Sequence, residues 1–338
     1  MPEHYAFVAT PIFAPSAALQ TFAEGCTARN WGVFVAGDKK SPPDFALAGA
    51  TYLAADADLP FRFSALCPFN HYGRKNIGYL AAIAEGADVI VESDDDNIPY
   101  DSFFAPRSRV VEATAVQETG WVNVYSRFTE KKIWPRGLPL AEVARPRPDW
   151  SAFPTAIVDA PIQQGLADVN PDVDALYRLI EATEVSFDAA PPIALGHGAW
   201  SPFNSQNTTW WRDAFPLLYL PFHCSFRMTD IWRSFVAQRL AWTCGWSVLY
   251  HRATVWQDRN AHDLMRDFAD EVPGYLHNQA IRETLDALPL KSGPENLLPN
   301  LANAYAALVG KGWISEAELP LVEAWCLDVE ALLSRAAV

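Results

Sequence analysis

Three consecutive carboxylates, Asp94, Asp95 and Asp96, follow a short apolar run at residues 89–91. The run predicts a β-strand, which Pro99 soon interrupts. In an open α/β sheet, ligands bind in the crevice beyond the carboxyl ends of the strands. Adjacent carboxylates raise one another's pKa unless a cation is supplied, and Mg²⁺ or Mn²⁺ would relieve that repulsion while holding a substrate's phosphates. We therefore expect a metal site here; a solvated acidic turn is the alternative.

Two cations precede the acids at the start of a predicted helix. Residues 74–86 (RKNIGYLAAIAEG) have apolar side chains at helical spacing, and Arg74 and Lys75 occupy the first turn. Cations at this end of a helix oppose the macrodipole, and a bound anion would offset that cost. Arg74 and Lys75 are therefore candidate anion ligands.

A further carboxylate, Asp230, opens a predicted helix at residues 229–244. It is either an N-cap or a general base that faces the crevice. The segment 196–213 is rich in Gly, amides and Trp, so Asn207 and its neighbours could bind sugar hydroxyls; capping and core packing explain the same residues. Asp172 and Asp174 lie at the start of a predicted helix over residues 172–181, where either acid could cap it, and we expect Asp172 to do so.

The order of the predicted elements indicates an α/β protein. Strands are expected near residues 5–10 and 31–36, with a helix at 16–29 between them, which predicts a parallel βαβ start. Residues 121–128 and 217–220 are further strand candidates. From His262 onward the pattern is helical. We therefore predict two parts, a catalytic domain at residues 1–258 and an α-helical C-terminal region at 259–338.

Composition excludes several classes of function. The 338 residues carry a net charge of −14, which argues against a nucleic-acid or anionic-membrane surface. No signal-peptide pattern or apolar stretch long enough for a membrane span is found. The five cysteines are scattered, which indicates free thiols in a reducing compartment, and we expect the cytoplasm.

Four segments in order (GDKKSP, RKNIGYLAAIAEGADVIVESDDDN, NSQNT and TDIWRSFVAQRL) together resemble the STELLO-type glycosyltransferases. A more distant similarity is to the plant reversibly glycosylated polypeptides, the UDP-arabinopyranose mutases. The resemblance covers residues 5–285. It implies a GT-A fold, a Rossmann-type mixed sheet flanked by helices that binds a nucleotide sugar through an aspartate motif and a divalent ion.

The resemblance also implies roles for single residues. Asp94 and Asp96 match the outer acids of the aspartate motif and would hold Mn²⁺ or Mg²⁺, while Asp95 matches its middle acid. Arg74 and Lys75 match the basic pair that would face the diphosphate.

Other matched positions follow the first two strands and the later blocks. Thr10 and Pro11 would hold the base, with Asp38 and Lys39 after the second strand. Asp230 and Trp232 match the block in which inverting enzymes keep their catalytic base. For a third metal ligand, His262 is the first choice and His251 the second.

The resemblance thus implies metal-dependent, inverting glycosyl transfer from a nucleoside-diphosphate sugar, for which a UDP-sugar is expected, with Asp230 as the base and a glycan or small molecule as the acceptor. The alternatives are a nucleotide-sugar mutase and a non-catalytic nucleotide-binding protein of the same fold. A Mg²⁺-dependent nucleotidyltransferase would need a Gly-rich phosphate loop, which TPIFAPS does not supply.

Overall fold

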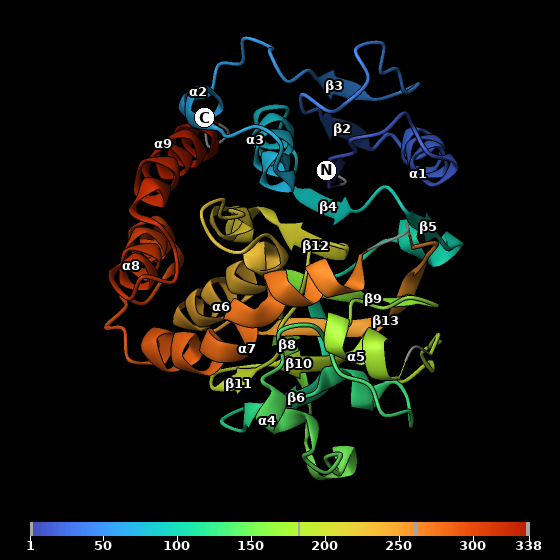
Figure 1. Ribbon diagram of the computed structural model, residues 1–338, viewed down its shortest axis with the longest axis vertical. Helices are drawn as coiled ribbons and strands as arrows, with labels where there is room; N and C mark the ends of the chain where they lie inside the picture. The colour runs from blue at the N-terminus through green and yellow to red at the C-terminus, as the bar shows by residue number, and fades with distance from the viewer. Residues whose placement is uncertain (1–2, 182, 260–262, 336–338) are drawn as a thin grey trace.

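A mixed β-sheet with helices on its faces forms the centre of the computed structural model, which describes residues 3–181, 183–259 and 263–335 (Figure 1). Within these residues eleven strands join in the order β3-β2-β1-β4-β12-β9-β13-β10-β6-β8, with β5 paired to β13. They are β1 Tyr5–Ala9, β2 Gly32–Ala36, β3 Thr51–Leu53, β4 Val89–Ser93, β5 Asn97–Pro99, β6 Val110–Val116, β8 Thr155–Asp159, β9 Ile162–Asp168, β10 Ile193–Leu195, β12 Asn207–Trp211 and β13 Val248–Gln257.

The first four strands of the order are parallel, as in a Rossmann-type sheet. Strands β1 and β4 are buried along their whole length, which explains why β1 and the first three residues of β4 are apolar on both faces. Helix α1 (Ala17–Thr27) lies between β1 and β2 in the chain, and its N-cap Ser16 accepts a hydrogen bond from the backbone of Leu19. Helix α3 (Lys75–Ala84) precedes β4. The predicted parallel βαβ start is confirmed.

Strand β12 runs antiparallel to both of its neighbours, β4 and β9. Its first residue, Asn207, pairs with Ser93 at the end of β4. The ends of β9 and β13 meet at Asp168 and Trp256. The carboxyl ends of β4, β9 and β13 therefore share one edge of the sheet, and this edge receives the acidic triplet.

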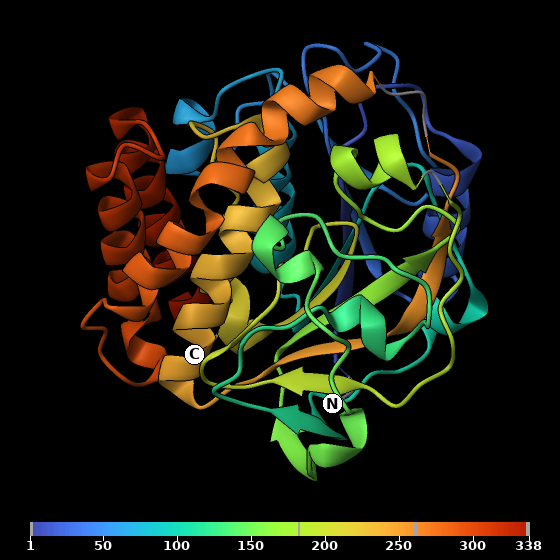
Figure 2. The ribbon, with the colours of Figure 1, turned by 60° about the horizontal axis from the view of Figure 1, so that its bottom comes forward.

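The C-terminal helices pack beside the sheet. They are α6 (Thr229–Ala241), α7 (Leu264–Asp286), α8 (Leu297–Gly310) and α9 (Leu319–Arg335), and both views show α8 and α9, in red, on one side of the molecule (Figures 1 and 2). Asp328 of α9 accepts backbone hydrogen bonds from Arg62 and Phe63, which begin α2 (Arg62–Leu66). Trp325 is fully buried and donates to the carbonyl of Pro216.

The predicted α/β class, with a mixed sheet, flanking helices and a C-terminal helical extension, is confirmed. One hydrophobic core continues from the sheet into α8 and α9, so the division after residue 258 stays a prediction. None of the helices among the described residues is long and apolar enough to cross a membrane. All five cysteines lie in the described part of the chain, and there they are unpaired thiols.

Two predicted strands are wrong. Residues 121–128 contribute only Trp121 to the short strand β7 (Gly120–Trp121), which pairs with β11 (Ala199–Trp200), and then turn into a 3-10 helix. Residues 217 and 218 end the 3-10 helix Arg212–Leu218, and residues 219 and 220 come directly after it. Pro216 explains the second error, because it lacks the N–H that a central strand needs. The apolar side chains at both places are buried in the core, but apart from Trp121 they do not belong to a β-strand.

Candidate active site

The acid at the end of β4 contacts the start of α3. Lys75 Nζ donates to Asp94 Oδ1 (3.1 Å) and to the carbonyl oxygens of Ser93 (3.2 Å) and Ser205 (3.3 Å). The side chain of Lys75 is only 2 % exposed, whereas that of Asp94 is 42 % exposed. Lys75 is thus a fixed positive charge beneath an acid that remains open to a ligand.

The rest of the triplet is held by its backbone and by β13. Gln257 donates from Nε2 to both carboxylate oxygens of Asp96, at 3.1 Å each. Ser16, the N-cap of α1, donates to the carbonyl oxygen of Asp95 at 2.5 Å. These bonds tie the acids to the ends of two other elements, so the triplet has a defined position at the sheet edge.

Burial and the charge of Asp96 raise the pKa of the other two acids of the triplet. Burial raises the pKa of Asp94, Lys75 opposes that rise, and Asp96 adds to it. Burial and Asp96 also raise the pKa of Asp95, to about 6. A divalent cation would remove the cost of holding these charges together.

The donor set fits a hard divalent ion. Among the residues that the structure describes, no group of three or more His, Cys, Asp and Glu side chains is arranged to hold a metal. Mg²⁺ is commonly held by one or two carboxylates while water and substrate phosphates complete its shell, and Asp94 and Asp96 suit that arrangement.

The third ligand predicted from the sequence does not come from the described residues. His262 lies outside them. His251 pairs with Gly165, which is three residues short of the end of β9, and it does not join the acids. Burial, with Arg107 and against the Arg252 carbonyl, lowers the pKa of His251 to about 4.

Arg74, the other member of the basic pair, faces away from the acids. Its Nε donates to the carbonyl of Gly37 (2.8 Å), and its guanidinium lies 4.0 Å from Asp38. Asp38 in turn accepts from the backbone N–H groups of Asn70 and His71. Arg74 and Asp38 therefore shape the loops beside the crevice rather than facing the acids.

The other residues predicted to bind the donor differ in how fully their polar groups are bonded. Thr10 Oγ1 is buried and has no hydrogen-bond partner among the described residues, so it has a free hydrogen-bonding capacity that a ligand could use. The carbonyl of Pro11 accepts from Ser41, and Lys39 Nζ lies 4.0 Å above the ring of Phe69. These residues follow β1 and β2, whose carboxyl ends share the edge with β4.

Two other predicted binding residues are enclosed. Asn207 Nδ2 donates to the Leu166 carbonyl (3.0 Å) and to Thr254 Oγ1 (2.8 Å) within the sheet. Trp232 is buried and donates to Asn278 Oδ1 of α7 (2.8 Å). Because their polar groups are bonded within the protein, both residues stabilise the structure around the site rather than contacting a ligand.

Asp230 lies in the first turn of α6 and forms a bidentate pair with Arg136. The two Nη atoms donate to the two carboxylate oxygens at 3.0 Å each. The backbone N–H of Ser205 also points to Oδ2, at 3.3 Å. Burial alone would raise the pKa of Asp230, but the Arg136 charge and hydrogen bonds outweigh burial and, with Arg233, lower it to about 2. Asp230 is therefore deprotonated at neutral pH.

Sequence reasoning missed Arg136 and misassigned Asp172. Arg136 also donates to both oxygens of Asp172, at 2.8 Å each, so one buried guanidinium bridges two acids. The prediction that Asp172 caps a helix is wrong, because Asp174 is the N-cap of α5 (Ala175–Ile180). The signal in the sequence was the glycine next to Arg136, because a glycine allows the backbone to approach another element closely. In the structure Gly137 has φ 92°, and a Cβ there would lie 2.4 Å from Ile231 of α6.

A second missed pair lies behind the site. Glu92 is fully buried in β4 and pairs with Arg233 of α6, at 2.9 Å between Oε1 and Nη2. Glu92 also accepts from the Tyr79 hydroxyl and from Trp210 Nε1. This pair fixes α6, and with it Asp230, against the strand that carries Asp94. Ser205 lies between the two acids: its carbonyl accepts from Lys75, the partner of Asp94, and its backbone N–H points to Asp230. Asp94 and Asp230 are therefore close to each other.

Comparisons with known proteins point to one family. The sequence model of the STELLO glycosyltransferases matches residues 227–333, which include Asp230 and Trp232. The chain is 30 % identical over 331 residues to "Probable glycosyltransferase STELLO1" of Arabidopsis thaliana, covering 90 % of this chain and 42 % of the relative. For "Probable glycosyltransferase STELLO2" the values are 29 % over 326 residues, 89 % and 42 %. The chain thus spans less than half the length of these relatives.

Among solved structures, the crystal structure of M. tuberculosis glucosyl-3-phosphoglycerate synthase aligns with a TM-score of 0.42 and 12 % sequence identity, over 82 % of this chain and 81 % of that one. The resemblance to the STELLO-type glycosyltransferases that the sequence motifs indicated is confirmed by the family match and the two relatives.

Proposed function

We propose that this chain, which is similar to the STELLO glycosyltransferases, transfers a glycosyl unit from a nucleoside-diphosphate sugar to an acceptor hydroxyl with the help of Mn²⁺ or Mg²⁺. The observation that carries the proposal is the position of the acids. Asp94 and Asp96 lie at the carboxyl edge of the sheet, with the fixed charge of Lys75 beneath them and Asp230 across the crevice.

The donor's diphosphate would bind over the acids and Lys75. A divalent cation held by Asp94 and Asp96 would neutralise the charge that builds up on the departing diphosphate. Lys75 keeps its hydrogen bonds to the Ser93 and Ser205 carbonyls, so it offers a second positive charge that needs no rearrangement when the bond breaks. The unpartnered hydroxyl of Thr10, at the end of β1, is available to the nucleoside, which we propose is uridine.

Asp230 would accept the proton of the attacking hydroxyl, with inversion at the anomeric carbon. Arg136 keeps it deprotonated, yet occupies both of its oxygens. Arg136 also bonds both oxygens of Asp172, so its charge stays paired if its bonds to Asp230 lengthen. We propose that acceptor binding lengthens the bonds between Arg136 and Asp230, so that Asp230 can take the proton. We also propose that the reaction takes place in the cytoplasm, because the unpaired thiols suit a reducing compartment.

Thermal unfolding with nucleoside diphosphates, each with and without Mn²⁺, tests the donor site. A ligand that binds the native state at 100 times its Kd stabilises it by about 2.7 kcal/mol. We expect UDP with Mn²⁺ to raise the Tm of the wild type and of Glu112→Gln, which removes an exposed acid on β6. Asp94→Asn and Asp96→Asn should lose that rise. An equal rise in Asp94→Asn, or none with any nucleoside diphosphate in the wild type, would overturn the proposal.

A further inference from the structure

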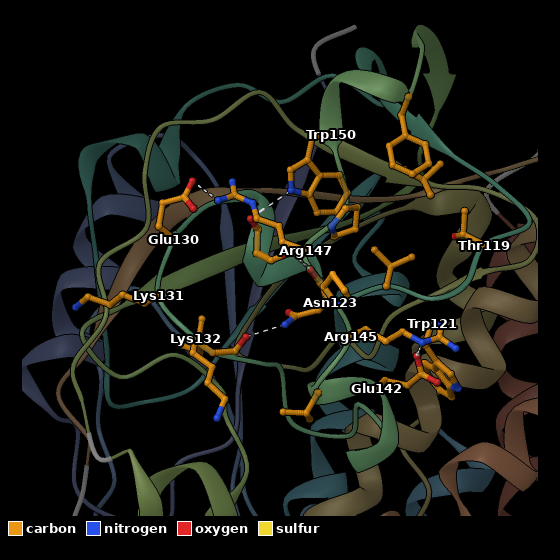
Figure 3. A pocket seen from close by; sticks show the side chains of 18 residues that line it. Thr119, Trp121, Asn123, Glu130, Lys131, Lys132, Glu142, Arg145, Arg147 and Trp150 are labelled. Atoms are coloured by element: carbon orange, nitrogen blue, oxygen red, sulfur yellow. Dashed lines mark hydrogen bonds and ion pairs between the residues drawn. The ribbon is translucent and has the colours of Figure 1, made fainter.

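A cavity of about 350 Å³ lies at the end of the sheet opposite the acids (Figure 3). Val116, the last residue of β6, lines it and pairs with Leu195. The strand pairings that continue from Leu195 across β13, β9 and β12 reach Ile90, near the start of β4. The cavity therefore lies level with the start of β4, whereas the acids follow its end. From strand spacing and rise, the cavity is on the order of 25 Å from Asp94. It is therefore separate from the proposed donor site.

The segment 129–153 forms much of the cavity wall and contributes its charged side chains. Arg145 Nε lies 2.6 Å from Glu142 Oε2, and Arg147 pairs with Glu130; both pairs are drawn in Figure 3. Each of these two arginines thus has a carboxylate partner in the wall. Lys131 and Lys132 also line the cavity, and they bond to Glu184 and Glu181 outside it.

Asn123 contributes an unsatisfied acceptor to this wall. Its Oδ1 is buried and accepts no hydrogen bond from the described residues, while its amide nitrogen donates to the carbonyl of Ile133 (2.7 Å). Glu142 Oε2, by contrast, has the guanidinium of Arg145 as its charge partner. An unpaired buried acceptor costs about 1–3 kcal/mol, so a hydrogen-bond donor in the cavity would be stabilising.

Aromatic side chains supply the apolar part of the wall. Trp150 donates to the carbonyl of Ser126 (3.3 Å), which fixes its indole, and Phe153 packs beside it with 6.0 Å between ring centroids. Trp121 lines both this cavity and an adjoining one of about 220 Å³. The larger volume falls within the roughly 300–1,000 Å³ of small-molecule sites, and apolar walls with a few polar groups are typical of them.

We propose that this cavity binds an uncharged carbohydrate unit. A sugar hydroxyl both donates and accepts, so it can donate to Asn123 Oδ1 and accept from Arg145, which Glu142 holds in place. The indole of Trp150 suits the C–H face of a sugar ring. A phosphate or sulfate ion would bring only acceptors and could not donate to Asn123 Oδ1. The site goes beyond the proposed donor site; that its carbohydrate belongs to the acceptor rests on the proposed function.

The test is an NMR titration of the full chain, followed through the indole N–H signal of Trp150, which the loss of one signal in Trp150→Phe assigns. The probes are neutral di- to tetrasaccharides of glucose, galactose, mannose and xylose, and inorganic sulfate as the anion. We expect a neutral oligosaccharide to shift the Trp150 signal in the wild type and in Asp94→Asn. The shift should be lost in Asn123→Leu and in Glu142→Gln, two variants that address the site through different elements.

The outcomes separate this site from the donor site. UDP with Mg²⁺, which is diamagnetic, should leave the Trp150 signal in place, so a failure of nucleotide binding does not affect this result. The proposal is overturned if no neutral oligosaccharide shifts the signal, if sulfate alone shifts it, or if a folded Asn123→Leu or Glu142→Gln protein binds the sugar as the wild type does.

Discussion

Glu92 lies in β4 and Asp94 directly follows the end of that strand, yet their surroundings differ sharply. Glu92 is fully buried and is paired with Arg233, Tyr79 and Trp210. Asp94 is 42 % exposed and has Lys75 as its partner. A buried acid with every oxygen satisfied holds the structure together. An acid at the strand end, crowded by Asp96 and open to solvent, is suited to a ligand.

The comparison predicts its largest effect for the buried acid. Glu92→Gln leaves the guanidinium of Arg233 buried without its charge partner, and breaking such a pair costs about 3–5 kcal/mol. Urea unfolding of the variant and the wild type measures the loss in the free energy of unfolding. A loss below 1 kcal/mol would mean that Glu92 is no structural anchor.

Asp230 is buried as Glu92 is, but it faces the crevice. We expect Asp230→Asn to reduce glycosyl transfer by about 10²–10⁴-fold, the usual contribution of a general base. Binding of UDP with Mn²⁺ should remain, because Asp94, Asp96 and Lys75 are unchanged. Transfer from a UDP-sugar and calorimetric UDP binding are measured on the same protein. Near-normal turnover would remove Asp230 from the mechanism.

His71 extends the comparison to a buried base. Burial and the neighbouring His223, against Asp38, lower the pKa of His71 to about 4, and its Nδ1 accepts from the Gly73 backbone at 3.0 Å. The folded state thus prefers neutral His71, whereas the unfolded chain takes up a proton below about pH 6.5. The resulting stability is complete above that pH and is lost as the pH falls toward 4.

We expect this loss to be on the order of 2 kcal/mol. Urea unfolding between pH 7 and 4 measures it, and His71→Asn is the matched control, since it keeps an acceptor for Gly73 but cannot take up the proton. An identical pH slope in wild type and His71→Asn would assign the effect to other groups.

The smallest effect on stability is expected at Asp94. Asp94→Asn removes the charge partner of the buried Lys75, but Lys75 keeps its bonds to the Ser93 and Ser205 carbonyls and the repulsion from Asp96 is relieved. The free energy of unfolding should therefore fall by clearly less than it does in Glu92→Gln. Urea unfolding beside Glu92→Gln makes the comparison direct. A loss as large as that of Glu92→Gln would show that Asp94 is structural.

The sequence predicted well what depends on neighbouring residues. The apolar run before Asp94 formed β4, and the helical spacing after Lys75 formed α3. These patterns are local, so propensity and burial agree. The apolar residues at 217–220 misled for the same reason, because burial in a 3-10 segment and burial in a strand produce the same local pattern.

What the sequence could not predict depends on contacts between distant parts of the chain. Arg136 meets Asp230 across 94 positions, and Glu92 meets Arg233 across 141. The same applies to Arg74: its place in the first turn suggested an anion, but the Gly37 carbonyl takes its hydrogen bond. Lys75 is the next residue, and successive side chains of a helix point in different directions, so Lys75 reaches Asp94 while Arg74 does not.

The central claim is that a cation on Asp94 and Asp96 binds a sugar nucleotide's diphosphate at the edge of the sheet. Anomalous diffraction from crystals soaked with Mn²⁺ and UDP tests it directly. We predict a manganese peak between these two carboxylates, with the diphosphate oxygens on the side of Lys75. Manganese and UDP bound elsewhere, with Asp94 and Asp96 contacting only water, would contradict the account.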